Sequence, residues 1–184
     1  VCGARGIRVV TDLSMDDIDL AQADMIVLPG GMPGTTNLYA DKRVTSAVRA
    51  MYDAEKYVAA ICAAPSVILG GMGLLKGRRA TCYPGMEDGM EGAEAVPATC
   101  VTDGKIITAC GVGGALDFAC ALITALISRE KADEIALSLG IPEDSGKRLF
   151  GAAAHVLRHN LKNGHTCLAR QTVVDLVRRL TGVN

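Results

Sequence analysis

The stretch YVAAICAAPSVILG, residues 57 to 70, predicts a strand that passes through a sharp turn into a helix. Its first five residues form an apolar run typical of a buried strand. Pro65 fits the first turn of a helix, where its missing N–H is not needed. Ala60 and Ala64 flank Cys62 two residues away on each side. Small residues at those positions let strand and helix backbones approach closely, as in the turn that presents the serine nucleophile of many hydrolases.

Two interpretations of Cys62 fit this local pattern equally. A thiolate at the start of a helix is stabilised by the helix dipole and by free backbone amides, which favours a nucleophile. A cysteine at the end of a strand is also a common small core residue. The local sequence leaves both open.

Strands and helices alternate on both sides of this stretch, which predicts an α/β fold around a mostly parallel sheet. The turn at Asp103-Gly104 predicts a hairpin between the last two strands. In the helix after residues 111–114 we expect one apolar stripe, made of Leu116, Ala119, Cys120, Ile123 and Ile127. Strands are expected at 25–28, 57–61, 79–82, 100–102 and 106–109, and helices at 45–54, from 65, after 114 and at 130–139.

A change of character at residues 142–146 (PEDSG) predicts a linker. We expect an α/β domain over residues 1–144 and a helical appendage over 145–184, in which two amphipathic segments form a helical hairpin. The appendage carries basic residues that could contact phosphates: Arg158, Lys162, Arg170, Arg178 and Arg179.

The composition and the apolar pattern of the sequence exclude several classes of protein. The 184 residues suffice for one domain with a core, and the net charge of −1 provides no field for nucleic acid or anionic membranes. No apolar stretch has the length of a membrane span, and the first ten residues do not resemble a signal peptide. The seven cysteines lack CxxC spacing. We therefore expect reduced thiols in a cytoplasmic protein, rather than a disulfide framework or a thiolate zinc site.

The three histidines, His155, His159 and His165, all lie in the appendage. The α/β body therefore cannot build an internal Cys–His dyad. With Cys167 nearby, a metal site in the appendage is conceivable, but a solvated polar face is the expectation, so we predict no metal.

The glycine-rich stretch LPGGMPG, residues 28–34, follows a predicted strand. Consecutive glycines let backbone N–H groups approach a ligand oxygen, as an oxyanion hole requires. In a parallel sheet this loop and Cys62 both lie at the carboxyl ends of strands, where ligand crevices form.

Four segments together resemble the ThiJ/PfpI superfamily, in the branch of the Parkinson's-disease deglycase. They are DMIVLPGGMPGTTNL, AAICAAP, ATCYPGMED and DGKIITACGVGGALDFACALI, and the resemblance spans about residues 1–142. It implies a flavodoxin-like three-layer sandwich, a homodimer and cofactor-independent chemistry on a small carbonyl substrate. It also implies that Cys62 is the reactive residue on a nucleophile elbow. Gly30, Gly31 and Ala63 would supply backbone oxyanion donors. Tyr83, which stands where several relatives carry a histidine, would be the second catalytic residue and would position or relay a proton.

The sequence departs from the family in three ways. The family's glycine-proline-glycine turn before the long helix reads Gly111-Val112-Gly113 here. No residue matches the glutamate that hydrogen-bonds the cysteine in relatives. The resemblance also begins only near residues 2–10 of this sequence. The family normally has a strand, a helix and a second strand before that point. We therefore expect a fragment, or a partner chain or the appendage in place of that segment, because the absent strand would otherwise leave an open sheet edge.

The appendage has a second resemblance, over some 35 residues, to the start of the small helical domain near the amino end of RecD-like helicases. It contains no P-loop, so helicase activity is excluded, and nucleic-acid contact is conceivable only through residues 147–184.

Three functions remain open. The first is a cysteine-dependent glyoxalase or deglycase acting on reactive dicarbonyls or their adducts. The second is a non-catalytic oxidative-stress sensor or chaperone-like protein using Cys62. The third is an α/β scaffold whose basic tail contacts nucleic acid or protein.

Overall fold

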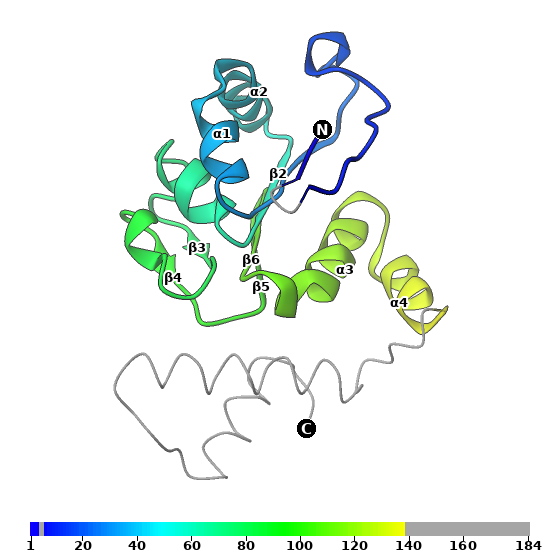
Figure 1. The fold of residues 1–184 in the computed structure, drawn as a ribbon. Helices are drawn as coiled ribbons and strands as arrows, with labels where there is room; N and C mark the ends of the chain where they lie inside the picture. Colours follow the sequence, from blue (N-terminus) through cyan, green and yellow to red (C-terminus); the bar gives the residue numbers. More distant parts are fainter. Residues whose placement is uncertain (4–5, 139–184) are drawn as a thin grey trace.

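A four-stranded sheet lies at the centre of the protein (Figure 1). The computed structural model describes residues 1–3 and 6–138. Three adjacent strands run parallel and the fourth is antiparallel, joined to its neighbour by a hairpin at Gly104. In sheet order the strands are β1 (Met25–Leu28), β2 (Tyr57–Ile61), β6 (Ile106–Ala109) and β5 (Cys100–Asp103). The mostly parallel sheet and the hairpin predicted from the sequence are confirmed.

One face of the sheet is covered by α1 (Gly34–Ala40), α2 (Lys42–Asp53) and the π-helical segment η2 (Pro65–Gly70). Helix α2 buries Val44, Val48 and Met51, which recur at the spacing of one helical face. It begins at Lys42, earlier than predicted, because the Asp41 side chain caps it by accepting a hydrogen bond from the Arg43 amide at 2.9 Å. Helix α1, which the sequence analysis did not predict, connects the glycine-rich loop to α2.

The opposite face is covered by α3 (Ala115–Leu126), and α4 (Arg129–Ser138) packs against α3. The three layers confirm the flavodoxin-like architecture, and Figure 1 shows α2 and α3 on opposite sides of the strands. The predicted apolar stripe of α3 is wrong. The sheet is contacted instead by Phe118, Ala121, Leu122 and Ala125, whereas Leu116 and Ile127 are exposed. Because α3 is apolar on both sides, its pattern alone does not identify the buried face.

The remaining features of the described chain are the edge strand of the central sheet and several short elements. Within the described ranges β1 lies at an edge of the sheet, and Val27 on it is 45% exposed. The short elements are η1 (Met15–Asp17), β3 (Arg79–Ala80), η3 (Glu87–Gly89), β4 (Glu94–Ala95) and η4 (Val112–Gly114), with β3 and β4 paired in a second, parallel sheet.

The appendage lies outside the described residues. Four expectations therefore stay predictions: the boundary at residue 144, the helical hairpin of 145–184, the solvated face of the three histidines and the phosphate contacts of the basic residues. Among the residues that the structure describes, no helix is both long and apolar enough to cross a bilayer.

Candidate active site at the ends of the central strands

Cys62 lies directly after β2, in the turn that leads into η2. Its φ angle is +67°, a left-handed conformation that non-glycine residues rarely adopt and that costs about 1–3 kcal/mol. Its amide donates to the Ala109 carbonyl at 2.8 Å, so the residue is anchored to the end of β6. Ala60 and Ala64 on either side are fully buried. This is the strained strand-to-helix turn expected of a nucleophile elbow, and the side chain is partly exposed.

Gly30 lies directly against this turn. A Cβ atom at position 30 would collide with the Cβ of Cys62 and would stand 2.8 Å from the Ile61 carbonyl oxygen. The same position is 3.1 Å from the amide nitrogen of Ala63. Only glycine lets the loop after β1 pack this closely on the elbow.

The loop is held in place from the other side by Thr35. Its amide and its hydroxyl both donate to the Gly31 carbonyl, at 2.8 and 2.9 Å, and Thr35 itself is fully buried. Gly31 has a φ of +90°, so a side chain there would be strained. Within the described part of the chain, the amides of Gly30, Gly31 and Ala63 donate no hydrogen bond. Gly30 therefore lies against the Cys62 turn, next to Ala63, and Gly31 follows directly in the same loop. Their role as oxyanion donors stays a prediction.

Tyr83 is attached to the same turn. Its amide donates to the Cys62 carbonyl at 2.7 Å, and its side chain is 50% exposed. Ser66 of η2 holds the loop that follows Tyr83, because its hydroxyl donates to the Met86 carbonyl at 2.7 Å. The predicted proton-relay residue thus lies beside the predicted nucleophile, on a loop fixed to the helix that follows the elbow.

Gly111 is a site residue that the sequence analysis did not select. A Cβ atom at this position would lie 3.6 Å from the Cys62 sulfur and 3.6 Å from the Tyr83 ring, and its φ is +133°. Gly111 therefore keeps open the space between thiol and ring. The glycine-rich turn after β6 was the available signal, but only the order of the sheet places that turn beside β2.

No side chain donates to or accepts from the Cys62 thiol among the described residues. The described ranges also contain no cluster of three or more acidic, histidine or cysteine side chains able to hold a metal ion.

Two other thiols have raised pKa values, mainly because they are buried. Burial raises the pKa of Cys82 to about 12, and the negative charge of Glu87 adds to the shift. Burial likewise raises the pKa of Cys100 to about 12, with Asp117 as the second cause. Both groups stay protonated at neutral pH, and a protonated thiol is a poor nucleophile.

This difference predicts the order of alkylation. At pH 8 iodoacetamide should label Cys2, which is exposed, and Cys62, which is partly exposed, long before Cys82 and Cys100. Peptide mapping of the native protein over time measures the order. Early labelling of Cys82 would contradict the buried position described for it, and the unfolded protein, in which all thiols should react, is the control.

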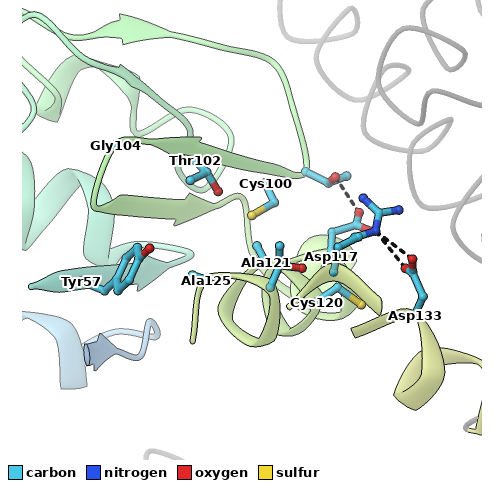
Figure 2. A pocket seen from close by; sticks show the side chains of 12 residues that line it. Tyr57, Cys100, Thr102, Gly104, Asp117, Cys120, Ala121, Ala125 and Asp133 are labelled. Atoms are coloured by element: carbon cyan, nitrogen blue, oxygen red, sulfur yellow. Dashed lines mark hydrogen bonds and ion pairs between the residues drawn. The ribbon is translucent and has the colours of Figure 1, made fainter. Parts of the chain in front are cut away.

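A cavity of about 570 Å³ lies elsewhere, between β5, α3 and α4 (Figure 2). Its wall contains two polar pairs: the Thr99 hydroxyl donates to Asp117 at 2.6 Å, and Arg129 contacts Asp133 at 3.0 Å. Of the predicted site residues (Cys62, Tyr83, Gly30, Gly31 and Ala63), none lines it. The candidate site is therefore the cluster at the strand ends.

Known protein families match both the α/β domain and the segment that follows it. The DJ-1/PfpI family model matches residues 1–125, and the HHH domain of the ATP-dependent RecD2 DNA helicase matches residues 119–167, which supports the resemblance inferred for the tail. A crystal structure of a mutant DJ-1 superfamily protein from Salmonella typhimurium superposes with a TM-score of 0.72 at 33% identity, covering 77% of each chain.

Two curated relatives are longer than the matched region. Protein DJ-1 homolog A of Arabidopsis thaliana is 37% identical over 155 residues, and a deglycase of Pyrococcus horikoshii is 36% identical over 111. These matches cover 80% and 59% of this chain, but only 38% of the Arabidopsis protein and 65% of the archaeal one. Because the family model covers more than half of the chain and the Salmonella protein is 33% identical over 77% of each chain, the chain belongs to the DJ-1/PfpI family.

Proposed function

We propose that the protein is a cysteine-dependent enzyme that converts small reactive dicarbonyls, or the adducts they form with amines and thiols. The observation that carries the proposal is the strained Cys62 turn packed against Gly30. The printed name of the archaeal relative, a deglycase, supports the same class of chemistry.

The reaction begins at the aldehyde carbon of the substrate. The Cys62 thiolate forms the C–S bond, and the carbonyl electron pair moves to oxygen, where the amides of Gly30, Gly31 and Ala63 stabilise the charge. Tyr83 supplies a proton to this oxygen, which yields a hemithioacetal. Through an enediol, the proton on the sulfur-bearing carbon moves to the neighbouring carbon, and the hydroxyl proton moves to that carbon's oxygen, which gives a thioester. Water hydrolyses the thioester to a hydroxy acid and releases the Cys62 thiol. Methylglyoxal and water thus become lactate, without a cofactor.

The test is methylglyoxal consumption by the purified protein. Wild type should consume it, and Cys62→Ser should lose on the order of a hundredfold or more of the rate, because the attacking atom is gone. Cys2→Ser is the matched control, since it removes an exposed thiol outside the site and should retain the rate. Equal rates in wild type and Cys62→Ser would overturn the proposal.

A second candidate is an oxidation sensor. It is favoured by the partial exposure of Cys62 and by the lack of a side-chain partner for its thiol in the described ranges. Selective oxidation of Cys62 by dilute peroxide, in a protein that leaves methylglyoxal unchanged, would favour this candidate over the enzyme.

A further inference from the structure

A second cysteine, Cys110, lies beside Cys62 at the end of the neighbouring strand. Strands β2 and β6 are parallel, with Ile61 paired to Ala109. The pairing extends one step further, because the Cys62 amide donates to the Ala109 carbonyl at 2.8 Å. Cys62 and Cys110 are therefore the next two residues in register. Neighbouring strands lie about 4.8 Å apart, within the Cα separation of roughly 4.4–6.8 Å that disulfides require.

A glycine stands next to each of the two sulfurs. Residue 111 is a glycine whose Cβ position would be 3.6 Å from the Cys62 sulfur, so no side chain is placed over that sulfur from this turn. Residue 114 is also a glycine, and a Cβ there would press on the Cys110 sulfur at 3.2 Å. Cys110 is 6% exposed, whereas Cys62 is partly exposed. An oxidant therefore meets Cys62 first, with Cys110 sheltered behind it.

We propose that Cys110 is the resolving thiol of Cys62, so that oxidation by a hydroperoxide ends in a Cys62–Cys110 disulfide. This inference rests on the reactivity of Cys62 in the proposed function. In the first step the Cys62 thiolate attacks hydrogen peroxide: an S–O bond forms, the O–O bond breaks, and hydroxide leaves with a sulfenic acid remaining. In the second step the Cys110 sulfur attacks the sulfenic sulfur. The S–S bond forms, the S–O bond breaks, and the thiol proton leaves with the oxygen as water.

Electrons balance across the two steps. The two thiols lose two electrons, and the peroxide gains them. The disulfide protects Cys62 from the irreversible sulfinic and sulfonic acids, and a dithiol reductant restores it.

Two other described thiols, Cys82 and Cys100, are less suited to this role. Cys82 is 3% exposed in the core beneath the site, and its sulfur contacts its neighbour's carbonyl, that of Tyr83, at 3.4 Å. Cys100 pairs with Ala109 from the far side of β6, so β6 separates it from Cys62. Cys82 nevertheless lies close enough to both thiols that their charges raise its pKa, which makes it the appropriate control.

The experiment treats the full chain with a small excess of hydrogen peroxide and measures intact mass and peptide maps without reduction. Wild type should lose two hydrogen atoms and yield one crosslinked peptide pair containing Cys62 and Cys110, and dithiothreitol should reverse both changes. Cys110→Ser should lose the crosslink and gain one and then two oxygen atoms on Cys62. Cys82→Ser should behave as wild type.

Three results would overturn the inference: oxygen addition to Cys62 in wild type with no disulfide, a crosslink to any other cysteine, or no change of mass. The wild-type peptide map shows whether the Cys62–Cys110 disulfide forms, even if Cys110→Ser does not fold. Oxidation is read by mass alone, so a protein that forms the disulfide but leaves methylglyoxal unchanged would overturn the proposed enzyme and not this inference.

Discussion

Gly30→Ala should lower the free energy of unfolding by about 2–3 kcal/mol, because its methyl group has no space. The new atom would overlap the Cβ of Cys62 and stand 2.8 Å from the Ile61 carbonyl oxygen. Neither backbone can retreat freely, since Leu28 and Ala60 pair in the adjoining strands. Methylglyoxal consumption should fall as well, because the loop and the elbow must move apart. Urea unfolding and rate measurements on the same sample check both effects.

Gly34→Ala is the matched control for this substitution. A Cβ at position 34 meets no heavy atom within 4 Å, and the residue begins α1. Alanine is a better helix former than glycine, so stability should change by no more than about 0.5 kcal/mol. If the two variants were equally stable, the close packing of the loop on Cys62 would be wrong.

Ile107→Ala should lower the free energy of unfolding by about 3–4 kcal/mol. Ile107 lies in β6 with no exposed surface, and it packs in the cluster formed with Ala59, Ala109 and Phe118 of α3. Truncation leaves a cavity between the sheet and the helix, which two rigid elements cannot close. Urea unfolding measures the loss.

Ile127→Ala is the control for Ile107→Ala. The same side chain is 68% exposed at the end of α3, so its removal should cost less than about 1 kcal/mol. Comparable losses at both positions would mean that α3 does not cover the second face of the sheet in the way described.

Only part of the candidate site could be predicted from the sequence. The segment around Cys62 carries its own signal, because small residues and a proline surround a cysteine after an apolar run. Gly30 and Gly31 follow a strand of the same kind, and that common position is enough to place them at one end of a parallel sheet. The glycine-rich turn at Gly111 does not by itself assign Gly111 or Cys110 to the site, since their importance comes from the strand that lies next to β2.

The role of Thr35 was equally inaccessible from sequence. A threonine after a glycine-rich loop is ordinary, and its function depends on being buried with both donors directed at the Gly31 carbonyl.

The sequence by itself determined the elements with strong local signals and the family. Strands at 25–28, 57–61 and 106–109 agree with the structure because each is an apolar run followed by turn residues. The tertiary structure alone decided which face of α3 is buried and which residues surround the Cys62 thiol. The reason is that α3 is apolar on both sides and that the neighbours of Cys62 come from four separate segments. Only pairing β2 with β6, and packing the loop after β1 on the elbow, brings those segments to one point.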